Sequence, residues 1–169
     1  MKKYSCPLFV LTIGLLSFSA CTAAPKLSPM QARQITTKMF ESGYENIYRA
    51  TLTVLQDQGY VIKNTDMASG LILASVDRKK SGGSQFFQAL MVGYVPNKGT
   101  EIELSCVVNK LNETSTELRI NIQEVKYGQS SVFSGSGKQD TKQIYDPKVY
   151  ENLFNDIQLE VKRREAINK

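Results

Sequence analysis

The chain has 169 residues, of which 41% are hydrophobic and 22% are charged, and its formal charge is +5. This length suits one domain, and the composition is that of a globular protein rather than a disordered one. Histidine is absent, which excludes His-dependent nucleophilic triads and His-liganded zinc and removes the commonest general base. The charge falls by two if Lys2 and Lys3 are removed with a signal, and so small an excess argues against nucleic-acid binding.

The first twenty residues have the three-part layout of an export signal. Two lysines near the start precede the apolar run Leu8–Leu16, and Ser19 and Ala20 stand directly before Cys21. The run is shorter than the roughly 20 apolar residues that a membrane-spanning helix needs. The pattern therefore predicts a signal peptide over residues 1–20 that is cleaved from the mature protein.

The tetrapeptide Phe18–Cys21 resembles the bacterial lipobox, although Phe18 stands where Leu is usual. The resemblance implies that the Cys21 thiol is diacylated and that the signal is cut before it, the alternative being an ordinary cysteine behind a plain signal. Two or more acyl chains, at roughly 0.8 kcal/mol per buried methylene, hold a protein stably on a membrane. Because Thr22 rather than Asp follows, the resemblance implies the periplasmic leaflet of the outer membrane. Residues 21–29 are predicted to be the acylated, extended tether.

Residues 30–169 are expected to form a single domain. The segment Gln31–Glu41 alternates loosely around a β-branched centre, which predicts a strand, with a helix as the alternative. Apolar residues at helical spacing predict a helix over Tyr44–Gln58, and Gly59 follows where a left-handed C-cap belongs.

Two hairpins are predicted after this helix. The first joins Tyr60–Asn64 to Leu71–Val76, and the second joins Ile102–Lys110 to Glu117–Tyr127 across a polar turn. Cys106 shares a strand face with apolar residues. Since Cys6 leaves with the signal and Cys21 is the acylation site, Cys106 has no disulfide partner and is predicted to be a buried core thiol rather than a reactive one.

The chain closes with weaker strand signals at Val132–Phe133 and Lys142–Tyr145 and then a well-marked helix. Asp146 is its expected cap, Pro147 suits its first position, and an apolar stripe follows. This order predicts an α+β fold, in which an antiparallel sheet of about four to six strands carries two main helices on one face, preceded by the cleaved lipoprotein signal.

Four phrases of the mature chain carry a further resemblance, and together they cover most of it. These phrases are Arg33–Phe40, Leu55–Ile62, Gly70–Ile72 and Ile144–Tyr150. They are similar to a family of small uncharacterised bacterial envelope lipoproteins. The resemblance supports the lipoprotein interpretation, but this family has no assigned activity or catalytic residues to carry over.

Two segments are candidate contact sites. The first follows the glycines at 82 and 83 and, if helical, places five apolar side chains on one face: Phe86, Phe87, Leu90, Met91 and Tyr94. Such a face can cover the core, meet a partner or dip into a bilayer, and core cover is the favoured interpretation. The second is the basic run Lys162–Arg164, which suits the negative end of the last helix dipole better than it suits lipid phosphates.

The sequence contains no convincing catalytic, cofactor or metal motif. Ser134–Lys138 looks like a phosphate loop, but Val132 and Gln139 occupy the places where a Walker loop needs Gly and Ser or Thr. We therefore expect a non-enzymatic, lipid-anchored protein of the bacterial envelope that binds another envelope component. The alternative is a small-molecule or lipid carrier with an apolar pocket between sheet and helix, bounded by residues 86–94.

Overall fold

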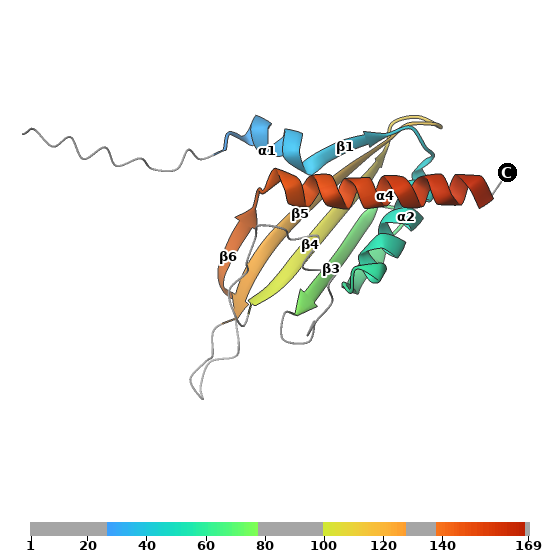
Figure 1. Ribbon diagram of the computed structural model, residues 1–169. Helices are drawn as coiled ribbons and strands as arrows, with labels where there is room; N and C mark the ends of the chain where they lie inside the picture. The colour runs from blue at the N-terminus through green and yellow to red at the C-terminus, as the bar shows by residue number, and fades with distance from the viewer. Residues whose placement is uncertain (1–26, 78–99, 128–137, 168–169) are drawn as a thin grey trace, which may run out of the picture.

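The computed structural model describes residues 27–77, 100–127 and 138–167. Six strands in this part form one antiparallel sheet in the order β1-β5-β4-β3-β2, and β6 pairs with β5 beside β1 (Figure 1). The elements in chain order are α1 Pro29–Thr36, β1 Thr37–Phe40, α2 Tyr44–Asp57, β2 Val61–Asp66, β3 Leu71–Asp77, β4 Thr100–Lys110, β5 Thr116–Tyr127, β6 Lys138–Ile144 and α4 Pro147–Ile167. The predicted α+β class and strand number are confirmed.

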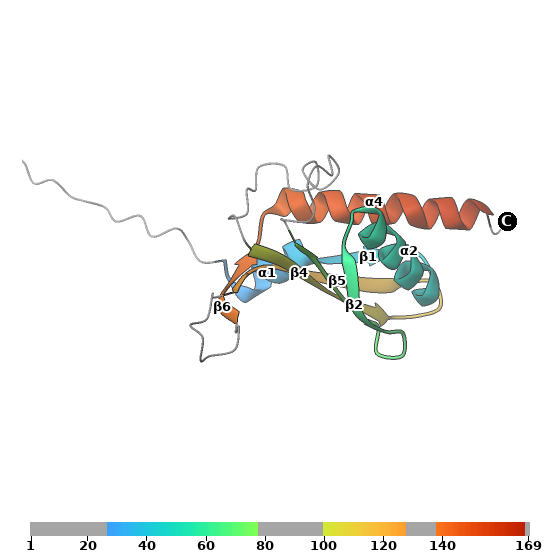
Figure 2. The ribbon, with the colours of Figure 1, turned by 90° about the horizontal axis from the view of Figure 1, so that it is seen from below.

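Both long helices lie on the same face of the sheet, as the sequence predicts. Figure 2 shows α2 and α4 on one side of the strands, and α1 lies at the edge formed by β1. The layer between helices and sheet is filled by buried apolar side chains. Among the largest of these are Phe40, Ile47, Leu55, Ile72, Leu104, Tyr150, Leu153 and Ile157.

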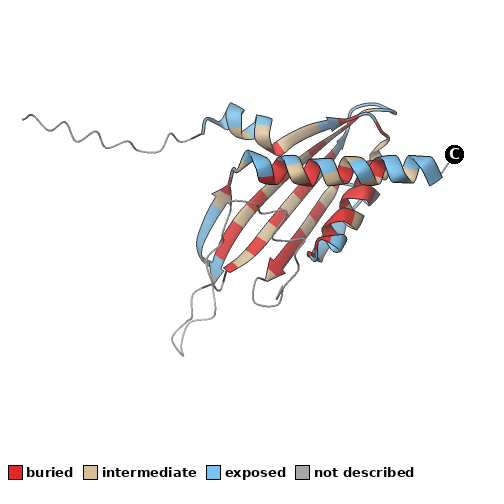
Figure 3. Ribbon diagram, in the orientation of Figure 1, coloured by how far each residue is buried: buried red, intermediate tan, exposed pale blue. Residues whose placement is uncertain are grey.

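The two longest strands show why the sheet has one buried face. Successive side chains of a strand point to opposite faces, so β4 carries alternating buried and partly exposed residues, seen as bands in Figure 3. The buried face of β4 carries Ile102, Leu104, Cys106 and Val108, and the opposite face carries Glu101, Glu103, Ser105 and Val107. Antiparallel pairing of β4 with β5 places Cys106 beside Ile120. Burial raises the pKa of the Cys106 thiol, as expected for a core residue.

The first element corrects the sequence prediction. The segment Gln31–Glu41 is not one strand, because α1 covers its first half and β1 begins only at Thr37. A capping box explains the helix: the Ser28 hydroxyl accepts a hydrogen bond from the backbone N–H of Gln31, whose side chain in turn accepts from the Ser28 N–H. Pro29 supplies the φ angle suited to the first helical position. The helix thus begins at the residue with which the predicted tether ends.

The predicted ends of the two main helices are confirmed. Gly59 follows α2 with φ +83°, the left-handed conformation that glycine adopts without strain. At the start of α4 the Asp146 carboxylate accepts a hydrogen bond from the backbone N–H of Lys148 at 3.0 Å. None of the helices in the described part of the chain is long and apolar enough to cross a membrane.

Candidate functional site

Most of the site residues predicted from sequence fall outside the described residues. This holds for the acylation site Cys21 and for the apolar face formed by Phe86, Phe87, Leu90, Met91 and Tyr94. The basic run Lys162–Arg164 is described, and it lies in the last turns of α4. There the structure brings it beside α2, an arrangement that the sequence does not indicate.

A polar groove lies between the N-terminal half of α2 and the C-terminal half of α4. It has a volume of about 490 Å³ and is lined by Gly43, Glu45, Asn46, Arg49 and Arg164. We call it the α2–α4 groove. Its walls are α2 and α4, and the apolar faces of both helices are buried in the same hydrophobic core. The polar side chains that line the groove are therefore held by rigid elements.

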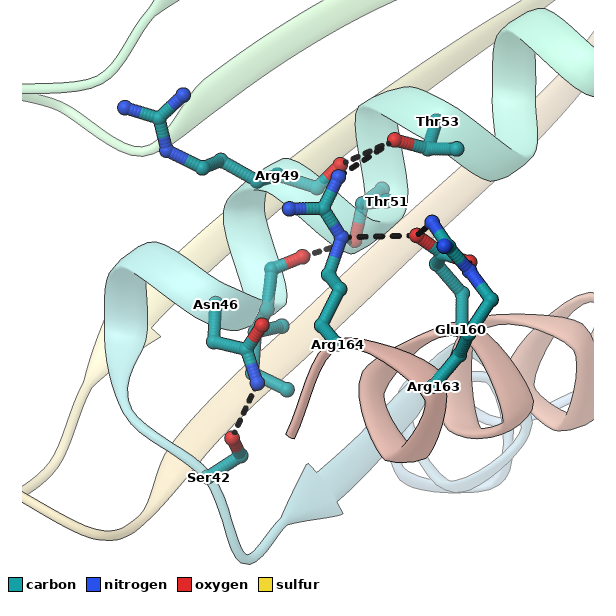
Figure 4. Close-up of polar contacts among 9 residues, drawn as sticks. Ser42, Asn46, Arg49, Thr51, Thr53, Glu160, Arg163 and Arg164 are labelled. Atoms are coloured by element: carbon teal, nitrogen blue, oxygen red, sulfur yellow. Dashed lines mark hydrogen bonds and ion pairs between the residues drawn. The ribbon is translucent and has the colours of Figure 1, made fainter. Parts of the chain in front are cut away.

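Glu160 holds Arg164, the residue with which α4 lines this groove (Figure 4). Its carboxylate accepts hydrogen bonds from Arg163 through Nε at 2.6 Å and Nη2 at 2.7 Å, and from Arg164 Nε at 2.8 Å. The bonds from Arg163 and Arg164 hold the pKa of the Glu160 carboxyl below its ordinary value, against the opposing effect of burial. The spacings of three and four residues are those at which helical side chains meet.

A hydroxyl on α2 connects the two helices. Arg164 Nη2 donates to Thr53 Oγ1 at 2.9 Å, and the Thr53 hydroxyl donates to the Arg49 carbonyl at 3.1 Å. Because Arg164 also holds Glu160, its guanidinium is fixed at both edges, as Figure 4 shows. The result is a positioned cation on the wall of the groove rather than a freely moving one.

Ser42, the residue before Gly43 of the groove, connects α2 and α4 to the sheet. Its hydroxyl accepts from Asn46 Nδ2 at 3.0 Å and donates to Glu165 Oε1 at 2.8 Å. Its carbonyl accepts from Thr116 Oγ1 at 2.8 Å. One loop residue therefore joins α2, α4 and the start of β5, which fixes the mutual placement of the two helices at this end.

Arg49 is the most available cation of the groove. It pairs with Glu45 at 2.8 Å, but the two side chains are 58% and 65% exposed. Exposed ion pairs of this kind contribute about 0–1 kcal/mol, so the Arg49–Glu45 pair can open at little cost. Arginine presents several donors in a planar fork that suits such anions.

The charges of this groove are those of arginines and of carboxylates that pair with them. Arginine stays protonated in proteins and does not serve as a general base, and the Glu45 and Glu160 carboxylates are occupied by arginines. In the described part of the chain, no group of three or more His, Cys, Asp or Glu side chains could hold a metal ion.

Two further grooves border α4 in the part of the chain that the structure describes. One, of about 250 Å³, lies at the other end of α2 and is lined by Val54, Asp57, Asp156, Leu159, Glu160 and Arg163. The other, of about 370 Å³, lies between α1, β1 and the start of α4. Both linings combine charged side chains with apolar ones, which are Val54 and Leu159 in the first groove and Ile35 and Phe154 in the second.

Sequence reasoning missed the α2–α4 groove because its two walls are more than a hundred residues apart. Local signals were present in the helical spacing of Glu45 with Arg49 and of Glu160 with Arg163. Such pairs are common on solvated helices, so they did not indicate a shared surface.

The comparisons with known proteins add no assignment. No protein-family model matches the sequence, and no curated protein matches it either.

Proposed function

We propose that the protein is a non-enzymatic lipoprotein of the bacterial envelope, held at the periplasmic face of the outer membrane through Cys21, that binds another envelope component. The observation that carries the binding proposal is the α2–α4 groove, where Arg49 on one wall is exposed and weakly paired and Arg164 on the other wall is fixed. The partner surface that fits it is polar and carries carboxylate or phosphate groups.

The rigidity of the groove supports this proposal. Its two helices each bury one face in the same hydrophobic core, and hydrogen bonds from α4 to Ser42 and Thr53 join them. A preformed polar surface loses little conformational entropy when it binds, which favours recognition by few contacts. The lipobox-like tetrapeptide before Thr22 supports the anchor.

The anchor is tested by labelling cells with a radioactive fatty acid. We expect label on the wild-type chain and none on Cys21→Ser, because that thiol is the acylation site that the lipobox offers. Label that persists on the Cys21→Ser chain would contradict the anchor.

The binding surface is tested by placing a photoreactive amino acid at position 46, which lines the groove, in living cells. We expect an adduct of defined mass that disappears when Arg49→Glu is added, because that change reverses the charge of the exposed arginine of the groove. Val61, exposed on the edge strand β2, is the matched control position, and it should give no such adduct. The same adducts from positions 46 and 61, or none from either, would contradict the proposed surface.

A further inference from the structure

The described domain has two ends, and exposed apolar side chains occur at both, Met30 at one and Leu111 and Ile167 at the other, so the tether decides which end meets the membrane. In Figures 1 and 2, α1 and the start of α4 lie at one end, whereas the β4–β5 turn and the end of α4 lie at the other. The α2–α4 groove belongs to the second end, since Gly43 and Arg164 line it.

The end that contains α1 exposes apolar side chains. Met30 is 70% exposed, and Leu27 before α1 and Tyr145 before α4 are also exposed. Two basic residues, Arg33 and Lys148, are exposed at the same end. An apolar, aromatic and basic mixture of this kind suits the surface of a phospholipid leaflet, where apolar groups enter the interface and cations meet phosphates.

The exposure of Met30 follows from how α1 packs. Its partly or fully buried positions are Ala32, Ile35 and Thr36, which face the rest of the domain. Met30 and Arg33 lie on the remaining surface of the helix, so neither is needed to hold α1 in place.

The length of the tether limits which end can face the membrane. The stretch from Cys21 to Leu27 spans at most about 21 Å, at roughly 3.3–3.6 Å per residue. The 21 residues of α4 extend about 32 Å, at 1.5 Å per residue. A lipid on Cys21 therefore keeps α1 near the leaflet, while the far end of α4 can lie beyond the reach of the tether.

We propose that α1 and the start of α4 form a lipid-contacting surface, made of Leu27, Met30, Arg33, Tyr145 and Lys148, that lies on the phospholipid headgroups. This proposal rests on the lipid anchor of the proposed function. The contact orients the domain so that the α2–α4 groove points away from the anchoring leaflet, towards a partner in the periplasm.

The test uses the full-length lipoprotein, reconstituted in vesicles of phosphatidylethanolamine and phosphatidylglycerol. Met30→Cys and Ile167→Cys are labelled separately with a thiol-reactive fluorophore. Their exposures are matched, at 70% and 67%, and they lie at opposite ends of the domain (Figure 1). Cys106 is buried, so the introduced thiol takes the label. Nitroxide-bearing lipids then quench a fluorophore that touches the leaflet.

We expect the fluorophore at position 30 to lose most of its emission and the one at position 167 to lose almost none. Tyr145→Cys provides a second position that should behave as position 30 does. Equal quenching at 30 and 167, or none at either, in a protein that floats with the vesicles would overturn this orientation and leave the anchor standing. A protein that does not float with the vesicles would overturn both.

Discussion

Gly70 shows how one residue fixes the place of a whole hairpin. It ends the turn between β2 and β3 with φ +73°, and its carbonyl accepts a hydrogen bond from the Val108 N–H at 2.9 Å. A Cβ at this position would lie 2.1 Å from the Val108 carbonyl oxygen. The close approach of the turn to β4 therefore requires a residue without a side chain.

We expect Gly70→Ala to destabilise the fold by about 3 kcal/mol or more, because it adds a backbone clash to the cost of a left-handed conformation. Gly59→Ala is the matched control. Gly59 has φ +83°, but nothing lies within 4 Å of an added Cβ, so it should cost only about 1–2 kcal/mol. Urea denaturation of the chain from Thr22 onward, followed by circular dichroism, measures both. Equal losses would mean that the clash is relieved by movement of the turn.

The helix α4 depends on one buried stripe, and this dependence can be tested with the same substitution on two of its faces. Leu153 is buried against the sheet, whereas Leu159 is exposed. We expect Leu153→Asp to cost about 3–5 kcal/mol, because it places an unpaired charge in the core and removes apolar contacts. Leu159→Asp should change the free energy of unfolding by no more than about 0.5 kcal/mol. Thermal melts distinguish the two, and similar losses would contradict the observed docking of α4.

Glu160 should make the attachment of α4 sensitive to acid. Its carboxyl has a lowered pKa in the folded protein, chiefly because Arg163 hydrogen-bonds to its charged form. The stabilisation is therefore complete above the ordinary glutamate pKa, about 4.3, and is lost as the pH falls through the lower folded-state value.

We accordingly expect Glu160→Gln to lower the melting temperature at pH 7, and we expect this difference to shrink as the pH falls below about 4. Glu151→Gln, on an exposed position of the same helix, is the control and should show no such dependence. A Glu160→Gln deficit that stays constant down to pH 3 would show that the ion pairs do not cause it.

The elements that the sequence predicts well are those whose signals are local. The helical stripe and the Asp146 cap of α4 act within one segment, and so does the alternation of β4 and β5. The segment around α1 was predicted less well, because Ile35 and Thr36 favour a strand by propensity. The capping box from Ser28 to Gln31 decides for a helix instead, and its two hydrogen bonds outweigh small differences in propensity.

The candidate site was less predictable because it arises only when the molecule is folded. The α2–α4 groove requires the Arg164 guanidinium to meet the Thr53 hydroxyl and Ser42 to meet Glu165. The spacing of residues within α2 or within α4 does not indicate that these side chains meet. At the scale of the whole molecule, the sequence predicts which faces of the helices and strands are buried. Only the packing of α2 against α4 shows which polar residues come together in the groove.

The placement of the groove leads to a prediction about residues 84–95, which lie outside the described residues. If binding depends on the α2–α4 groove and this apolar segment covers the core, then Phe87→Ser with Met91→Ser should remove stability and function together. Losing a buried aromatic or Met side chain costs roughly 2–5 kcal/mol. Arg49→Glu should do the opposite, abolishing the adduct with the partner while the melting temperature stays unchanged, since Arg49 is exposed.

Thermal melts and crosslinking from position 46, which lines the groove, measure both effects on the same proteins. A double variant that melts within about 2 °C of wild type has lost less than about 1 kcal/mol of its free energy of unfolding. So small a loss would indicate that Phe87 and Met91 are exposed, because exposed positions contribute little to stability. If that variant also failed to crosslink, residues 84–95 would be the recognition surface. Arg164 would then only hold α4 against α2.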